Sequence, residues 1–325
     1  MADMSVKVCG VDFKNPIIPA SGVFGYGREY EELFPLNKLG GIATKGTTLH
    51  RRTGNLAPRI AETPAGMLNS VGLQNPGIDH FIETELPYLL ERDLVVLANI
   101  AGSTPEECAQ VAAKLESTDV HMIELNISCP NVKQGGAAFG TSCDMAAEVT
   151  RQVRKATTKP LVVKLSPNVT SIAEIAKSVE AAGADAVSLI NTLLGMRIDI
   201  NTGRPVLRNN VGGMSGPAVF PIAVRMVWQV ANAVSIPVIG MGGVSSGRDA
   251  IELMMAGASA VQVGAAIFTD PYAPVRIVEE MNEFLDSKGI ASVKDIIGTV
   301  KPWLAAADFN GKIVCSGDMY DNNVG

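Results

Sequence analysis

Long apolar runs, excess positive charge and clustered metal ligands are all scarce in this 325-residue sequence. No run of 18 apolar residues occurs, so we expect no segment to cross a membrane. The net charge of −6 argues against nucleic acid or an anionic membrane surface as the main partner. Because the first residues lack the basic and apolar regions of a signal peptide, we expect a cytoplasmic protein.

Cysteine and histidine are also too few and too scattered for a metal site. The five cysteines are odd in number and never spaced as CxxC, which favours reduced thiols over disulfides and argues against zinc or iron–sulfur ligation by this chain alone. We therefore predict no metal site. The cysteines and histidines of the sequence are Cys9, Cys108, Cys129, Cys143, Cys315, His50, His80 and His121.

Short β-branched runs alternate with helical stretches along the whole chain. Strands that alternate with helices favour a parallel sheet, and eight of them favour an α/β fold of the (β/α)₈ TIM-barrel type over an open doubly wound sheet. With 47% hydrophobic residues the chain can bury a large core, and we expect one domain over residues 1–325. The predicted strands are Ile17–Pro19, Gly41–Lys45, Val95–Asn99, Met122–Asn126, Leu161–Leu165, Ala186–Ile190, Pro237–Met241 and Ala260–Val263.

Several helices carry recognisable start signals at Thr104, Ser171 and Ser246. The segment Val6–Phe13 predicts a β-hairpin at the bottom of the barrel. Long connections in a compact domain are usually functional, so we expect the long loops to cover the C-terminal face. These loops are Gly46–Asp93, Thr192–Ile236 and Pro130–Gly140, while the tail 301–325 has no assigned role.

Polar or small residues stand at the carboxyl end of nearly every predicted strand. Amides and lysines are costly inside a packed core unless they are paired, and the carboxyl ends of barrel strands meet on one face. The sequence therefore predicts an active site there, although any one of these residues alone fits a structural role. They are Ala20, Ser21, Lys45, Gly46, Asn99, Asn126, Lys164, Asn191, Thr192, Gly242, Gly243, Gly264 and Ala265.

The glycine pairs Gly242-Gly243 and Gly264-Ala265 follow strands 7 and 8, the usual phosphate position of a barrel. Glycine lets backbone N–H groups approach phosphate closely, and the helix that opens at Ser246-Gly247 could add its dipole. The alternative is that these glycines only form tight turns.

Two lysines at strand ends, Lys45 and Lys164, need anionic partners in such a setting. A reduced flavin and a substrate carboxylate would each supply one. The alternative is that both side chains extend out of the barrel mouth into water.

Cys129 follows strand 4 and is the candidate reactive side chain. A cysteine nucleophile usually has a histidine beside it, but His121 lies eight residues earlier, roughly 26 Å away along an extended strand. His50 and His80, in the long second loop, are not excluded. We therefore favour Cys129 as a general base. The alternatives are that it acts as a nucleophile or is only a small buried hydrophobic residue.

The segment from Asn126 to Gly136, with the sequence NISCPNVKQGG, resembles the catalytic loop of dihydroorotate dehydrogenases. The similarity covers about residues 5 to 290. It extends over Asn15–Gly22, Thr44–Thr47, Asn69–Asn75, Lys164–Asn168, Ile190–Thr192, Gly212–Gly216 and Gly240–Gly243.

This resemblance implies one FMN per chain and the oxidation of dihydroorotate to orotate in pyrimidine synthesis. It makes Cys129 the base that takes the C5 proton while the C6 hydride passes to flavin N5. Ala265 departs from the family pattern, which commonly has a hydroxyl residue there. The implied substrate residues are Lys45, Asn69, Ser70, Val71, Gly72, Leu73, Asn126, Asn131, Asn191 and Thr192. The implied FMN residues are Ala20, Ser21, Lys45, Gly46, Asn99, Asn126, Lys164, Ile190, Gly216, Gly242, Gly243, Gly264 and Ala265.

A cysteine base implies a class 1 enzyme, and the stretches GLQNPG and Lys133–Gly136 resemble type 1B. That type is a homodimer within a heterotetramer, whose second, iron–sulfur flavoprotein subunit carries FAD and a [2Fe-2S] cluster and reduces NAD⁺. The alternatives are a fumarate-dependent class 1A enzyme, a dihydropyrimidine dehydrogenase-like subunit, and a barrel that binds a phosphorylated ligand without redox chemistry.

Overall fold

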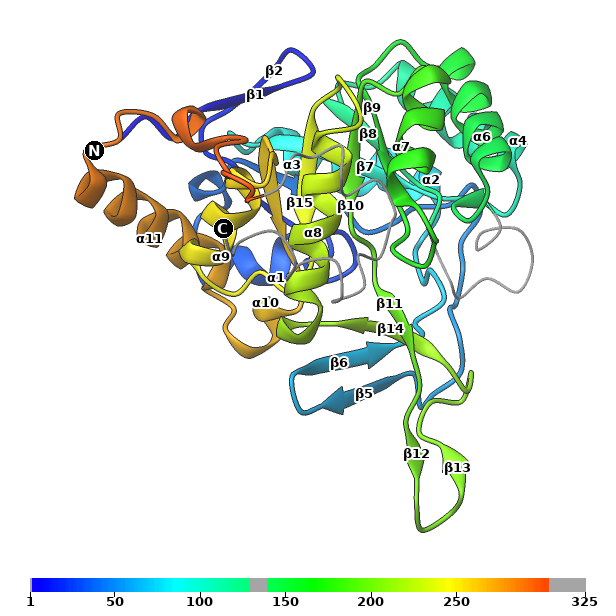
Figure 1. The fold of residues 1–325 in the computed structure, drawn as a ribbon. Coiled ribbons are helices and arrows are strands. Elements are labelled where there is room, and N and C mark those ends of the chain that lie inside the picture. The colour runs from blue at the N-terminus through cyan, green and yellow to red at the C-terminus, as the bar shows by residue number, and fades with distance from the viewer. Residues whose placement is uncertain (1, 129–138, 304–325) are drawn as a thin grey trace, which may run out of the picture.

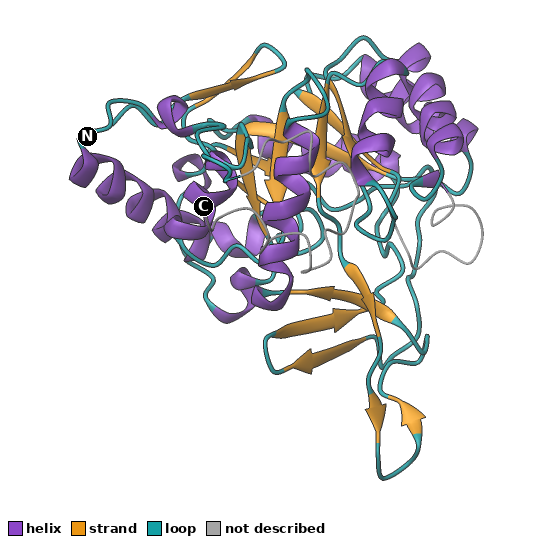
Figure 2. Ribbon diagram, viewed as in Figure 1, coloured by secondary structure: helices purple, strands orange, loops and turns teal. Residues whose placement is uncertain are grey.

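The computed structural model describes residues 2–128 and 139–303, and residues 1, 129–138 and 304–325 lie outside this description. Its centre is a parallel eight-stranded sheet. The Gly40 N–H donates to the Ile17 carbonyl at 3.1 Å and joins the two end strands, so the sheet closes into the predicted barrel (Figure 2). Its order is β3 (Ile17–Pro19), β16 (Ala260–Val263), β15 (Val238–Met241), β10 (Ala186–Leu189), β9 (Leu161–Lys164), β8 (Met122–Asn126), β7 (Val95–Ile100), β4 (Gly41–Ala43).

All eight predicted strands are confirmed, with ends that differ by up to two residues. β4 stops at Ala43 rather than Lys45, because the Lys45 N–H leaves the sheet and donates to the Gly25 carbonyl. β15 begins at Val238 because Pro237 has no N–H to donate. Further small differences are the ends of β7 at Ile100, of β9 at Lys164 and of β10 at Leu189.

Helices surround the barrel, and their predicted caps are present (Figure 1). The hydroxyls of Thr104, Ser171 and Ser246 each accept the backbone N–H three residues later. The longer helices are α4 (Pro105–Glu116), α6 (Cys143–Ala156), α7 (Ile172–Ala181), α8 (Phe220–Ala231), α9 (Gly247–Met255) and α11 (Ala273–Lys288). Shorter ones are α1 (Arg28–Glu31), η1 (Leu36–Lys38), α2 (Ile78–His80), η2 (Phe81–Glu85), α3 (Leu86–Leu90), η3 (Pro217–Val219), α10 (Ala266–Thr269) and η4 (Val293–Ile296).

The predicted N-terminal hairpin is formed by β1 (Val6–Val8) and β2 (Val11–Phe13). Its buried face, which includes Val8 and Phe13, packs on the barrel, and the Phe13 ring lies beside Gly41 at the start of β4. It therefore covers the N-terminal end of the barrel, opposite the long connections (Figure 1).

The two long connections are not simple loops, which corrects the prediction. They supply barrel helices, from α2 to α3 and α8, and they meet in an antiparallel sheet below the barrel (Figure 1). An isolated two-stranded hairpin has marginal stability. Strands from both connections therefore combine into one four-stranded sheet, which buries Leu68. Its strands are β11 (Leu193–Gly195), β14 (Gly212–Ser215), β6 (Gly66–Asn69) and β5 (Ile60–Thr63), and β12 (Ile198–Asp199) with β13 (Arg204–Pro205) forms a separate hairpin.

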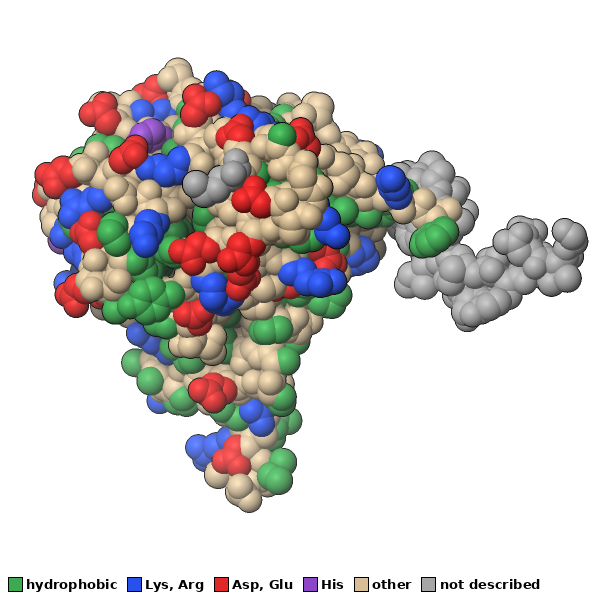
Figure 3. Space-filling model, turned by 90° about the vertical axis from the view of Figure 1, so that its left-hand side faces the viewer, with side chains coloured by type: hydrophobic (Ala, Val, Ile, Leu, Met, Phe, Trp, Pro, Cys, Tyr) green, Lys and Arg blue, Asp and Glu red, His purple; other side chains and the backbone are tan. Residues whose placement is uncertain are grey.

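The surface mixes charges of both signs, as Figure 3 shows for one face. The narrow lower end in that view carries hydrophobic side chains. On the β12–β13 hairpin, Ile198 and the following Ile200 are exposed. Within the residues described, no helix has the length and apolar character that spanning a bilayer would take.

Candidate active site

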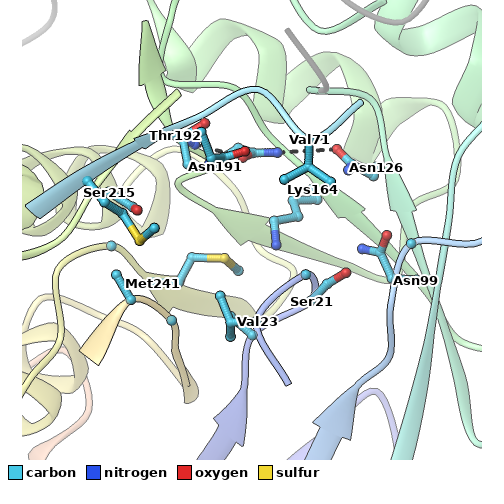
Figure 4. Close-up of a pocket in the computed structure, with 18 of the residues that line it drawn as sticks. Ser21, Val23, Val71, Asn99, Asn126, Lys164, Asn191, Thr192, Ser215 and Met241 are labelled. Carbon is cyan, nitrogen blue, oxygen red and sulfur yellow. Dashed lines mark hydrogen bonds between the residues drawn. The ribbon is translucent and has the colours of Figure 1, made fainter. Parts of the chain in front are cut away.

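A cavity of about 400 Å³ opens at the carboxyl ends of the barrel strands, roofed by the antiparallel sheet. The structure brings together here almost all predicted site residues (Figure 4). Those that line it are Ala20, Ser21, Lys45, Gly46, Asn69, Val71, Gly72, Leu73, Asn99, Asn126, Lys164, Ile190, Asn191, Thr192, Gly216, Gly242, Gly243, Gly264 and Ala265.

Three predicted residues are not part of this lining. Cys129 and Asn131 lie outside the described residues, as does most of the predicted loop 130–140. Ser70 is fully buried beside the cavity, where its N–H donates to the Arg59 carbonyl and its carbonyl accepts from Asn55. Its main-chain bonds thus hold the loop that carries its neighbour Val71 to the cavity.

Asparagines are held in defined orientations on one wall. The Asn191 Nδ2 donates to Ser128 Oγ at 2.6 Å and to Asn126 Oδ1 at 3.4 Å, and Asn191 Oδ1 accepts the Thr192 N–H at 2.7 Å (Figure 4). Asn126 Oδ1 also accepts the N–H and Oγ–H of Ser128. This wall offers amide donors and acceptors in fixed positions, as a cyclic imide requires.

The two lysines differ in their surroundings. Lys164, 5% exposed, points into the cavity, with its Nζ 3.8 Å from the Oε2 of fully buried Glu124 (Figure 4). Lys164 therefore has an anionic neighbour within the chain that the sequence did not reveal, and the flavin expected beside it stays a prediction. Lys45 also lines the cavity, and its backbone N–H donates to the Gly25 carbonyl.

Sequence reasoning missed the residues beneath the cavity floor. Glu124, Ser188 and Gln262 are fully buried, and Ser188 Oγ and Gln262 Nε2 both donate to the Glu124 carboxylate. A carboxylate in the buried strand β8 was the available signal, since a charge there must be paired. Lining residues that were also missed are Val23, Ile60, Met67, Ser215, Met241 and Phe268.

Glycines that follow β14, β15 and β16 line one part of the cavity. Gly216 and Gly243 have φ of +108° and +77°, and a Cβ on Gly243 would lie 2.7 Å from the Gly216 carbonyl oxygen. The start of α9 is not part of the cavity lining. The N–H groups of Ser246 and Gly247 donate to the carboxylates of Asp249 and Glu280, which would repel a further anion, so the geometry does not support a phosphate at this helix.

Two observations indicate that the cavity lining suits FMN. The Asn99 Oδ1 is buried without a protein partner within the described residues, so it awaits a donor from a ligand. The tight glycine turns leave backbone exposed where a phosphate would lie.

Histidine takes no part in the described cavity. His121 precedes β8, at the other end of the barrel, where its Nδ1 accepts the Val96 N–H at 3.1 Å. His50 and His80 are exposed on the surface. In the described part of the chain, no three His, Cys, Asp or Glu side chains gather as metal ligands.

Comparison with known proteins agrees with this geometry. The family description "Dihydroorotate dehydrogenase" matches residues 3–285. A relative from Geobacillus sp. (strain WCH70) is 54% identical over 299 residues, which is 92% of this chain and 96% of the relative. A relative from Phocaeicola vulgatus is 54% identical over 302 residues, 93% of this chain and 100% of the relative. Both are named "Dihydroorotate dehydrogenase B (NAD(+)), catalytic subunit". The predicted resemblance is confirmed, and the chain belongs to the dihydroorotate dehydrogenase family.

Proposed function

We propose that this chain oxidises dihydroorotate to orotate as the FMN-containing catalytic subunit of an NAD⁺-dependent enzyme. Family membership and the type B relatives support this activity. The observation that carries it is a single cavity with a cationic floor at Lys164 and a wall of oriented amides at Asn126 and Asn191. The floor suits a flavin and the wall suits a pyrimidine ring.

In this proposal the flavin ring of FMN is held by Lys164, Asn99 and Ser21. The phosphate of FMN is held by the glycines around Gly216 and Gly243. When bound, FMN supplies the acceptor for a hydride. The buried Asn99 Oδ1 accepts an N–H of the ligand, and Lys164 donates to its carbonyl oxygens or balances negative charge.

On the substrate side, Asn126, Asn131 and Asn191 bind the pyrimidine edge and the carboxylate together with Lys45. Cys129 removes the proton from C5 while the hydride leaves C6, so that a C5–C6 double bond forms. Cys129 acts as the thiolate and becomes a thiol on taking this proton, and the hydride with its two electrons would pass to bound FMN. The hydroxyl of Ser128, the residue before Cys129 in the sequence, is bonded to Asn126 and Asn191 and so belongs to the substrate wall.

The electron acceptor beyond this chain is a partner that carries FAD and a [2Fe-2S] cluster. The relatives' names, which specify a catalytic subunit and NAD⁺, support a second subunit. Exposed apolar side chains on the β12–β13 hairpin, such as Ile198 and Ile200, support burial against another chain. We propose a homodimer within a heterotetramer, located in the cytoplasm.

Purification with and without a co-expressed partner tests the function. The expected result is a yellow protein that oxidises dihydroorotate and reduces NAD⁺ only with the partner. Turnover with fumarate and the chain alone would indicate class 1A instead. Oxidation of dihydrouracil but not dihydroorotate would indicate a dihydropyrimidine dehydrogenase, and a colourless protein that does not take up FMN would exclude flavin chemistry.

A further inference from the structure

A buried carboxylate lies directly beneath the cavity floor and touches none of the cavity surface. Glu124 projects from β8 into the barrel, and its side chain is fully inaccessible. Its Oε2 accepts from Asn99 Nδ2 at 2.6 Å, and its Oε1 accepts from Ser188 Oγ at 2.8 Å and Gln262 Nε2 at 2.7 Å. With Lys164 Nζ at 3.8 Å, side chains from four other barrel strands, β7, β9, β10 and β16, converge on it.

This arrangement fixes the direction of the Asn99 amide. A carboxylate only accepts hydrogen bonds, so Asn99 must turn its Nδ2 toward Glu124. Its Oδ1 is then left buried, without a partner among the described residues. Because Asn99 lines the cavity, Glu124 determines that this position offers an acceptor to the ligand rather than a donor.

The same carboxylate offsets the charge of Lys164. Glu124 and Lys164 are the two charged side chains buried within the described barrel strands. A buried lysine beside a flavin stabilises the extra negative charge of the reduced form, whereas a carboxylate behind that lysine opposes this effect. The pair therefore orients a cation at the cavity floor without leaving a full positive charge uncompensated.

We propose that Glu124 is a positioning residue that holds Asn99 and Lys164 against the flavin and lowers its reduction potential. A lower potential favours passing electrons onward to NAD⁺. This inference rests on the proposed function, because it needs FMN in the cavity.

The test is the reduction potential of the bound flavin in Glu124→Gln, which removes the charge and keeps the shape. We expect the potential to rise by about 30 mV or more, the equivalent of a tenfold change in the two-electron equilibrium. Lys164→Met should shift the potential the opposite way. An unchanged or lowered potential in Glu124→Gln overturns the proposal.

Two further variants separate charge from packing. Ser188→Ala removes one hydrogen bond to Glu124 but no charge, so its potential should stay near that of the parent. Glu124→Asp keeps the charge on a shorter arm, so FMN affinity of the apoprotein should fall several-fold with little change in potential. If Glu124→Gln does not fold, unchanged FMN affinity in Glu124→Asp overturns the proposal instead.

The parent protein separates this inference from the proposed function. A parent that fails to bind FMN or to oxidise dihydroorotate refutes the proposed function itself. A parent that does both, with no shift in the Glu124 variants, refutes only the role of Glu124.

Discussion

Replacing Gly216 by alanine tests how the projecting sheet and the cavity depend on each other. Gly216 lines the cavity at φ +108°, where an L-residue is strained. A Cβ there would lie 2.5 Å from the Cα of Gly66 and 3.1 Å from the carbonyl oxygen of Ala65, in the β5–β6 turn. Both obstacles are backbone atoms, so no side chain can rotate away.

The cost follows from two separate effects. The backbone conformation alone costs an alanine about 1–3 kcal/mol. Forcing an extra methyl into packed surroundings costs about 1–3 kcal/mol more. Since a domain of ordinary stability has only about 5–15 kcal/mol, the chain should relieve the overlap by moving the β5–β6 turn rather than unfold.

Gly203→Ala is the matched control. Gly203 also has positive φ, +65°, but its Cβ would meet nothing within 4 Å, so the backbone strain is present without the overlap. Urea unfolding should show a loss of about 1–2 kcal/mol for Gly203→Ala and a larger loss for Gly216→Ala. Titration of apoprotein with FMN should show at least tenfold weaker binding for Gly216→Ala only. Equal effects of the two substitutions would refute the reasoning.

Four other expectations can be measured directly. Cys129→Ser should retain FMN but oxidise dihydroorotate about 10²–10⁴-fold more slowly at pH 7, with a rate that rises toward high pH; parental rates at pH 7 would refute the base assignment. Asn191→Ala should lower kcat/KM for dihydroorotate by roughly tenfold through lost hydrogen bonds, without changing FMN content; unchanged steady-state kinetics would remove it from the substrate wall. Burial raises the pKa of the Cys9 and Cys108 thiols to about 12. Peptide mass spectrometry should therefore find both thiols unalkylated after treatment with iodoacetamide at pH 8. The stability that these neutral thiols contribute should be complete below pH 9 and decline as the pH rises toward 12. Burial lowers the pKa of His121. The stability that neutral His121 contributes should therefore be present above pH 6.5 and fall as the pH drops below 6.5. If thermal unfolding of His121→Gln shows the same acid dependence as the parent, this expectation is wrong.

The barrel could be predicted from the sequence because each strand is a short apolar run between strong helix caps. Parallel strands buried on both faces give such runs, and the hydroxyls of Thr104 and Ser246 mark where helices begin. The antiparallel sheet could not be predicted in the same way. Its strands include Gly66–Asn69 and Gly212–Ser215, which are short and rich in glycine and pair only because residues 144 positions apart meet at Asn69 and Gly213.

The site divides along the same line. Strand ends can be read from sequence, so the cavity lining was largely predicted, although the roles assigned to Cys129 and Asn131 stay predictions. The environment of Lys164 could not be read, because its partner Glu124 lies on another strand, and only barrel closure brings the two together.

Glu124 shows what a single charged residue in a buried run can indicate. Within Met122–Asn126 it is the one charged residue, and apolar packing cannot explain it, so a partner must exist. The sequence does not say whether that partner is a metal, a ligand or another side chain. The structure answers with Asn99, Ser188 and Gln262 as donors and Lys164 as counter-charge. Asn99 and Lys164 also line the cavity. Glu124, a charged residue in the barrel core, therefore connects the barrel interior to the chemistry at the carboxyl ends of the strands.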